Sequence, residues 1–231
     1  MLDREDEGSW EIAEPMVKQL IAKPDFPRLI SFPRTGSHWL RMLMELYFEK
    51  PSLVRAFYFK EAAEFTCYHR HDQELNEQCK NVIYLYRNPV DTIYSQLAYY
   101  KENICSPERI KFWTQLYARH LVKWLFEENF TTKKTIITYE GLQRNLCGEF
   151  EKICCHLNVA FDPGRIAQAA QEISKEKLKD KTRHDPQVIN LSSAYVWSRE
   201  TFKEQNAKAV FSTLLATDAR LGNMFPCLSE L

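Results

Sequence analysis

The turn after the apolar run Leu29–Phe32 has the residue types of a small anion-binding site. It reads PRTGSH, residues 33–38. Gly36 lets the backbone curl until its N–H groups converge, Ser37 can cap a helix and donate its hydroxyl, and Arg34 supplies a guanidinium fork for phosphate or sulfate oxygens. The glycine spacing and Lys-Ser/Thr pair of the common nucleotide-binding loop are missing, which indicates a different phosphate ligand. The alternative is an ordinary strand-to-helix turn.

Polar residues also follow NVIYLY, residues 81–86, whose β-branched and aromatic residues are typical of a buried parallel strand. Arg87 leaves the carboxyl end of this strand, Pro89 suits the first turn of a helix, and Ser95 falls about two turns into that helix. Because ligands gather at the carboxyl ends of strands in open α/β sheets, Arg87 and Ser95 are candidates to hold a second phosphate.

Two histidines stand near the end of another short strand, in TCYHRHD, residues 66–72. His69 and His71 fall on the same side of an extended chain, with Arg70 opposite. An imidazole titrates near neutral pH, so either histidine can act as a general base if it faces the anion site. The alternative is a pair of solvated loop histidines.

The elements that must position these residues alternate between strand and helix, which predicts one α/β domain over residues 1–231. Strands are expected at 29–32, 66–72, 81–86 and 134–139. Helices are expected at 12–21, after residue 37, after residue 89, at 107–129, from beyond residue 142 through 156, at 163–179 and at 199–215. Residues 1–10 are expected to form a loose tail, and 180–195 a polar loop.

Composition narrows the class of protein. Lysine plus arginine equals aspartate plus glutamate at 31 each, so no overall charge draws the chain to nucleic acid or to a membrane surface. No apolar run approaches the length of a membrane span. The seven cysteines have no paired metal-ligand spacing, and the N-terminus is acidic without an apolar signal region. We therefore expect reduced thiols, a cytoplasmic location and no metal.

Three segments in order, SFPRTGSHWL, NVIYLYRNPVDTIYSQ and ITYEGLQRN, resemble the sulfotransferases that use 3′-phosphoadenosine 5′-phosphosulfate (PAPS) as donor. They are similar to that family's 5′-phosphosulfate loop, its 3′-phosphate segment with an RNPxDxxxS pattern, and its YED-L element. The likeness covers roughly residues 28–160. It implies a three-layer α/β fold, with a central parallel sheet flanked by helices, related to the P-loop nucleotide kinases. It also implies 3′-phosphoadenosine 5′-phosphate (PAP) as product.

The resemblance assigns roles to individual residues. The 5′-phosphosulfate loop corresponds to Arg34, Thr35, Gly36, Ser37, His38 and Trp39, of which Trp39 is also a candidate to stack on adenine. The 3′-phosphate corresponds to Arg87 and Ser95, and the position beside the adenine to Tyr139. His71 is the first choice for the catalytic base and His69 the second, followed by Glu61 or Glu64.

The chain departs from the family pattern at three places. Arg34 stands where many members have a lysine, which keeps the charge but not proton donation. His38 replaces a common threonine or serine; it could donate to the leaving phosphate or merely pack. The late RKG segment, another 3′-phosphate contact, is missing, and its substitutes are expected among Lys179, Lys181, Arg183 and Arg199.

The expected reaction is in-line transfer of a sulfuryl group to an acceptor hydroxyl, with Arg34 and His38 stabilising the departing phosphate. The aromatic residues between 57 and 68 permit a phenolic or other apolar alcohol, although they could equally pack in the core. Carbohydrate acceptors remain open, as do the oligomeric state and a lid over 180–195. Two other functions are weighed: a small ATP-dependent phosphotransferase and a non-catalytic nucleotide-binding homologue.

Overall fold

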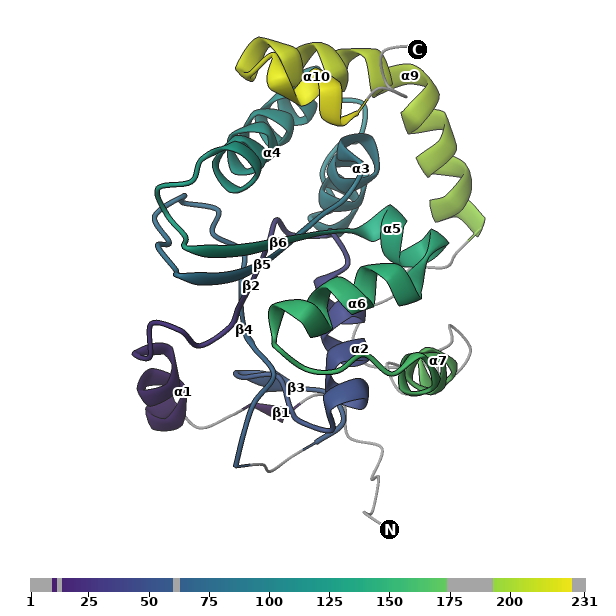
Figure 1. Cartoon of the computed structure of the whole chain (residues 1–231). Coiled ribbons are helices and arrows are strands. Elements are labelled where there is room, and N and C mark those ends of the chain that lie inside the picture. The colour runs from purple at the N-terminus through teal and green to yellow at the C-terminus, as the bar shows by residue number, and fades with distance from the viewer. Residues whose placement is uncertain (1–9, 12–13, 60–62, 174–192, 226–231) are drawn as a thin grey trace.

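The computed structural model describes residues 10–11, 14–59, 63–173 and 193–225. Helices and strands alternate along most of this chain (Figure 1). The elements are β1 (Trp10–Glu11), α1 (Glu14–Ile21), β2 (Arg28–Ser31), α2 (Ser37–Phe48), β3 (Arg55–Ala56), β4 (Tyr68–Arg70), β5 (Asn81–Tyr86), α3 (Pro89–Tyr99), α4 (Pro107–Phe126), β6 (Lys133–Thr138), α5 (Tyr139–Arg144), α6 (Leu146–His156), α7 (Pro163–Glu172), α9 (Ser193–Thr217) and α10 (Arg220–Met224).

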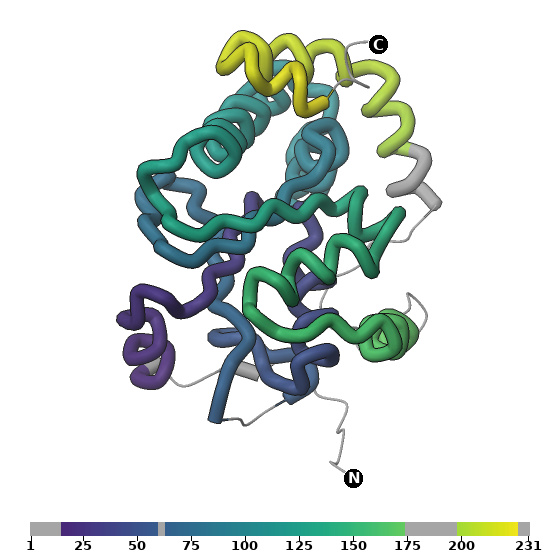
Figure 2. The backbone as a smooth tube through the Cα atoms, viewed as in Figure 1, coloured from purple at the N-terminus to yellow at the C-terminus, as the bar shows by residue number. Residues whose placement is uncertain are grey.

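The central sheet has four parallel strands in the order β4-β2-β5-β6. The chain runs from β2 through α2 to the edge strand β4, then returns to place β5 on the other side of β2 (Figure 2). All four strands overlap the segments predicted as strands from the sequence. The structure adds a small antiparallel sheet of β1 and β3, in which Trp10 pairs with Ala56. Trp10 was therefore wrongly assigned to the loose tail, because a two-residue strand carries no periodic pattern.

Helices cover both faces of the sheet, which gives the three layers that were predicted (Figure 1). Successive strand residues point to opposite faces. Val82 and Tyr84 enter the core formed with α3, α4, α9 and α10. Ile83 and Leu85 enter the core formed with α2, α6 and α7. The central strand β5 therefore contributes alternate residues to two apolar layers, as expected for a parallel sheet.

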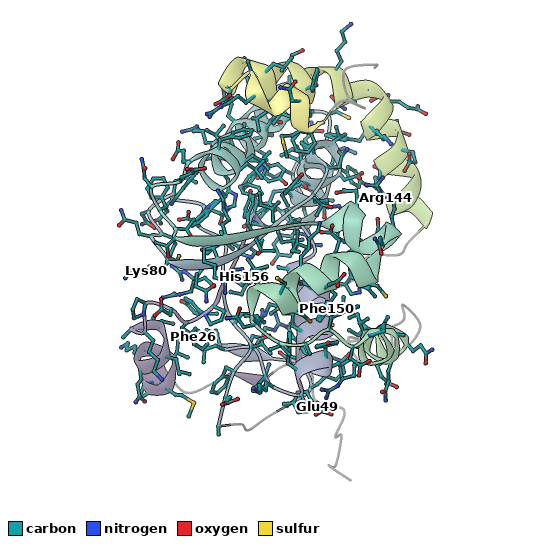
Figure 3. The ribbon with its side chains drawn as sticks, in the orientation of Figure 1. Phe26, Glu49, Lys80, Arg144, Phe150 and His156 are labelled. Atoms are coloured by element: carbon teal, nitrogen blue, oxygen red, sulfur yellow. The ribbon has the colours of Figure 1, made fainter. Side chains whose placement is uncertain are left out.

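The segment after β6 differs from its prediction. Residues 139–142 form the start of a separate helix, α5, and a second helix, α6, begins at Leu146. Asn145 separates the two because its extended backbone ends α5 while its side chain accepts from the Gly148 N–H and caps α6. Phe150 of α6 faces the layer that contains α2 and packs 4.7 Å from the Tyr47 ring (Figure 3).

The parallel arrangement brings four loops to one edge of the sheet, because the carboxyl ends of all strands lie there. These loops follow β2, β4, β5 and β6, and they carry the turn 33–36, His71, Arg87 and Tyr139. The residues singled out from the sequence thus belong to one edge. None of the helices in the described part of the chain is long and apolar enough to cross a membrane.

Candidate active site

The turn between β2 and α2 depends on two left-handed backbone positions. Arg34 has φ 68° and Gly36 has φ 96°. A Cβ atom on Gly36 would lie 2.5 Å from Cδ2 of Tyr139, so the aromatic ring also requires glycine here. Gly36 occupies the N-cap and Ser37 is the first residue of α2, with no side-chain cap. Ser37 was therefore wrongly predicted to cap the helix, and the first N–H groups of α2 have no side chain capping them.

The two predicted phosphate sites are contiguous. Arg34 Nε donates to Ser95 Oγ over 3.2 Å, which joins the loop after β2 to α3. Arg87 Nη1 donates to the main-chain carbonyl of Arg34, also over 3.2 Å. The structure thus collects two guanidinium groups and a hydroxyl at the edge of the sheet, where a ligand with two phosphate groups can meet all three.

Arg87 is held by a residue that sequence reasoning did not select. The Tyr117 hydroxyl donates to the Arg87 carbonyl over 2.7 Å and accepts from the Arg87 N–H over 3.0 Å. Tyr117 is fully buried, and burial raises the pKa of its hydroxyl, which stays protonated and can donate. Arg87 Nε is buried and has no hydrogen-bond partner among the described residues. A buried donor of this kind fits an anion.

The residues assigned to the adenine meet beside the arginine residues. The Arg87 guanidinium lies 4.4 Å from the centroid of the Tyr139 ring. The Trp39 and Tyr139 rings meet edge to face, with 5.6 Å between centroids. These two rings therefore border the anion site with flat apolar surface, which is suited to a purine.

The two histidines both contact Ser31, the last residue of β2. His69 Nε2 lies 2.9 Å from Ser31 Oγ, and His71 Nδ1 lies 3.1 Å from the Ser31 carbonyl oxygen. A carbonyl only accepts, so His71 Nδ1 carries the hydrogen and Nε2 keeps its lone pair. Burial lowers the pKa of His71 to about 4, and the charges of Arg41 and Arg34 act in the same direction. His71 is therefore neutral at physiological pH, with a basic Nε2.

The hydrogen bond of His69 does not determine its tautomer, unlike the bond of His71 to a carbonyl oxygen. Its partner is a hydroxyl, which can donate or accept, so the position of the His69 ring hydrogen is not fixed by the contact. Burial, followed by the charges of His71 and Arg41, holds the pKa of His69 well below its usual range. Only His71 thus has its lone pair assigned by geometry. Ser31 was missed in the sequence, although a polar residue ending a buried strand was a usable signal.

His38 and the carboxylate alternatives lie in other surroundings. The His38 ring packs edge to face against Phe57, with 5.5 Å between centroids, and its charge contributes to lowering the pKa of His69. Glu64 forms an exposed ion pair with Lys50 and does not contact the histidines. Glu61 lies outside the described residues.

Comparison with known proteins identifies the family. The family model described as "Sulfotransferase domain" matches residues 66–208, which is more than half of the chain. The protein belongs to the sulfotransferase family. The matched range contains the histidine pair, Arg87, Ser95 and Tyr139, whereas the turn 33–38 precedes it.

A solved structure shares the fold. The crystal structure of mouse sulfotransferase SULT7A1 complexed with PAP matches with a TM-score of 0.56 and 17% identity, covering 94% of this chain and 93% of the mouse chain. The α/β architecture of the present sulfotransferase is therefore the sulfotransferase fold that was predicted. A search of curated proteins gives no significant match.

Helix α4 of this sulfotransferase holds the segment that carries His71 and Asp72. His120 Nε2 donates to the His71 carbonyl over 2.9 Å, so His120 Nδ1 accepts from the Tyr84 hydroxyl at 3.0 Å. Burial lowers the pKa of His120 to about 3, which keeps its ring neutral. The next residue, Asp72, accepts from Lys123 Nζ over 2.8 Å and from Trp124 Nε1 over 2.9 Å. Sequence patterning predicts a buried face of α4 that includes Trp124, but it gives no indication of the partners of His120, Lys123 or Trp124.

The substitutes proposed for the missing RKG segment are mostly untested. Lys179, Lys181 and Arg183 lie outside the described residues, as does the predicted loop up to residue 192. Residues 193–195, which were predicted to be part of that loop, instead begin helix α9. Arg199 of α9 is described, and its Nε donates to Asp91 over 2.8 Å. This ion pair ties α9 to the first turn of α3, the helix that carries Ser95.

A polar hollow of about 310 Å³ opens beside the histidine pair of the sulfotransferase. Eight residues between His69 and Glu77 line it, and all of them are histidine, arginine, aspartate, glutamine, glutamate or asparagine. Leu75 is the one residue of this run that does not line it. The hollow thus adjoins His71 and is lined by residues that offer hydrogen-bonding groups.

Proposed function

We propose that this sulfotransferase moves the sulfuryl group of PAPS to an acceptor hydroxyl. The observation that carries the proposal is the cluster of Arg34, Ser95 and Arg87, joined by hydrogen bonds and bordered by Tyr139. The mouse relative of the same fold is described as a complex with PAP, which supports the same nucleotide here.

The residues present fit such a donor. The buried Arg87 Nε supplies a donor with no protein partner in the described chain, and the uncapped first turn of α2 supplies main-chain N–H groups. In the proposal, Arg87 and Ser95 hold the 3′-phosphate, while Arg34 and residues 35–38 hold the 5′-phosphosulfate. Trp39 and Tyr139 would hold the adenine. PAPS, when bound, supplies a sulfuryl group activated by its phosphate leaving group.

The proposed chemistry rests on His71. Its Nε2 takes the proton of the acceptor hydroxyl as the acceptor oxygen attacks sulfur in line, while the bond from sulfur to the phosphate oxygen breaks. The Arg34 guanidinium, with Ser37 and His38, stabilises the charge that appears on the departing phosphate. The hydrogen bond from Nδ1 to the Ser31 carbonyl keeps the correct tautomer in place. Alignment and fixed charge would supply most of the rate.

The donor site is tested by calorimetric titration with PAP, adenosine 5′-phosphate, and ATP with magnesium. We expect PAP to bind best and without magnesium. Arg87→Ala should weaken PAP binding about 10- to 100-fold, because charged hydrogen bonds contribute about 1.5–3 kcal/mol, and should leave adenosine 5′-phosphate almost unaffected. Arg119→Ala, on the exposed face of α4, is the matched control.

Two results would redirect the proposal. A preference for ATP with magnesium, unchanged by Arg87→Ala, would favour an ATP-dependent phosphotransferase. PAP binding without release of PAP from PAPS, over a broad set of acceptors, would favour a non-catalytic homologue.

A further inference from the structure

The hollow beside His71 has the lining of a site for a hydroxyl-rich molecule. A general base must lie within hydrogen-bond reach of the proton it takes, so the acceptor of the proposed reaction must occupy space next to His71. The hollow is such a space. Gln73 and Asn76 each offer an amide that can donate and accept, which matches a hydroxyl group, itself a donor and an acceptor. Its volume lies at the small end of ligand sites, which suits about one sugar ring.

The charges around the hollow argue against an anionic acceptor. Its arginine, Arg70, is paired with Glu77 over 3.0 Å, and Asp72 is paired with Lys123 over 2.8 Å. Glu74 accepts from Asn76 and has no cationic partner among the described residues. The surplus charge of the lining is therefore negative. Arg34, Arg41 and Arg70 place positive charge near His71, whereas Glu74 makes its own end of the hollow negative. At the Glu74 end a neutral or amine-bearing group is therefore favoured over a carboxylate or sulfate.

The wall of the hollow is built before any acceptor arrives. The Asp72 carboxylate is fully buried and accepts from Lys123, Trp124 and the Glu77 N–H, the last over 2.9 Å. These bonds fix both ends of the loop 72–77 against α4. A fixed wall reduces the entropy lost on binding, which is what a small polar ligand with few contacts requires.

Phe57 and Tyr58, two of the aromatic residues that permitted a phenolic acceptor, make contacts outside the hollow. The guanidinium groups of Arg41 and Arg55 lie 4.9 and 5.7 Å from the centroid of the Phe57 ring. Phe57 and Tyr58 pack against the core shared with α2, and Glu45 accepts both of their main-chain N–H groups. Neither ring lines the hollow, and the Phe57 ring also meets His38 edge to face, with 5.5 Å between centroids. Phe57 and Tyr58 therefore contribute no aromatic wall to the hollow itself.

We propose that the hollow binds the acceptor, and that the acceptor is a neutral or amine-bearing polyol of about one sugar ring. The proposal deepens the function given above and rests on it for the role of His71. Gln73 and Asn76 bind the hydroxyl groups that are not modified, and Glu74 distinguishes an amine from a carboxylate.

Binding and transfer are measured separately to test this. Saturation-transfer NMR with the full chain and saturating PAP uses methyl glucoside, methyl glucosaminide, glucuronate and 4-nitrophenol as probes. We expect signals from the first two. Gln73→Ala and Asn76→Ala should each weaken sugar binding about fivefold, as expected for one lost hydrogen bond. Glu74→Gln should remove the preference for the amine. Gln168→Ala on α7 and Glu204→Gln on α9, both exposed, are the matched controls.

Each outcome decides between the two proposals. Sugar signals that weaken in the lining variants and not in the controls support the hollow, whether or not PAP is released from PAPS. Absent sugar signals, equal signals in all variants, or stronger binding of 4-nitrophenol or glucuronate would overturn it. Release of PAP with a phenol, unaffected by Gln73→Ala, would overturn the hollow while leaving the sulfotransferase reaction intact.

Discussion

The two halves of the candidate site lie at one edge of the sheet but are held in place by different means. On the donor side, the turn 33–36 is shaped by its own backbone, and its motif residues bond to each other, as Arg34 does to Ser95. On the histidine side, His71 and Asp72 are held by His120 and Lys123 of α4. The donor side is therefore built largely from motif residues that bond to one another, whereas the candidate base is held by α4. Helix α4 also reaches the donor side, since Tyr117 bonds the Arg87 main chain.

Removing the base would separate the two halves most clearly. We expect His71→Ala to lower kcat by about 10²- to 10⁴-fold, the usual contribution of a general base, while the affinity for PAP stays within about twofold. Release of PAP and calorimetric titration measure the two quantities. Arg87→Ala should show the opposite pattern, with affinity lost first. Full activity of His71→Ala would reject this residue as the base and make His69 the next candidate.

Breaking the pair between Asp72 and Lys123 tests how far α4 supports the histidine side. Lys123→Met leaves a fully buried carboxylate without its charged partner, which costs about 3–5 kcal/mol in the free energy of unfolding. Urea denaturation followed by circular dichroism measures the loss. Lys203→Met, at an exposed position on α9, should change stability by less than about 0.5 kcal/mol. If both substitutions lowered the free energy of unfolding equally, the pair between Asp72 and Lys123 would not be a specific support of the histidine side.

Acid should weaken the histidine side before the donor side. Burial lowers the pKa of His71 to about 4 and that of His120 to about 3, against about 6.5 in the unfolded chain. Below pH 6.5 the unfolded state therefore binds protons that the folded state does not, and the free energy of unfolding falls with pH. The loss between pH 7 and 5 is about 2 kcal/mol for each residue. Urea titrations at the two pH values measure it, and His120→Gln should show a smaller decrease.

Donor binding should couple the two sides through charge. The Arg34 charge contributes to lowering the pKa of His71, so an anion bound at Arg34 should raise that pKa, by about one unit. NMR titration of His71 with and without PAP measures the shift, and His156, which bonds Thr135 on β6, is the internal control. A pKa of His71 that PAP leaves unchanged would mean that the two sides act independently.

Much of the fold follows from local patterns in the sequence. Strands β2, β5 and β6 contain short apolar runs, whereas β4 reads Tyr-His-Arg. Helices α3 and α4 both begin at a proline after an asparagine or serine cap, as Pro89 and Pro107 show. Arg34, Arg87 and Tyr139 were found for a similar reason, since each stands shortly after a strand, whereas Ser95 lies within α3. Both the secondary structure and the donor motifs are therefore predicted from residues that lie close together in the sequence.

The features that the sequence did not predict depend on contacts between residues that are far apart in the chain. His120 and Lys123 reach partners 49 and 51 positions earlier, and no pattern within α4 identifies those partners. Their polar side chains within a buried face were the one available signal, because buried polar groups are almost always bonded. The hollow could not be predicted from the sequence for a similar reason, because its shape depends on how α4 holds the loop 72–77.

The all-parallel sheet also bears on how this protein reaches its native state. Arg28 of β2 pairs with Tyr68 on one side and with Val82 on the other, so neither neighbour is a hairpin partner. Closing such long loops costs entropy before any ladder hydrogen bond forms, and we expect slow folding as a result. On the ribosome, β2 would wait first for β4 and then for β5 to emerge before both of its edges are paired. In that interval at least one edge of β2 is unpaired, and we expect the early nascent chain to bind chaperones.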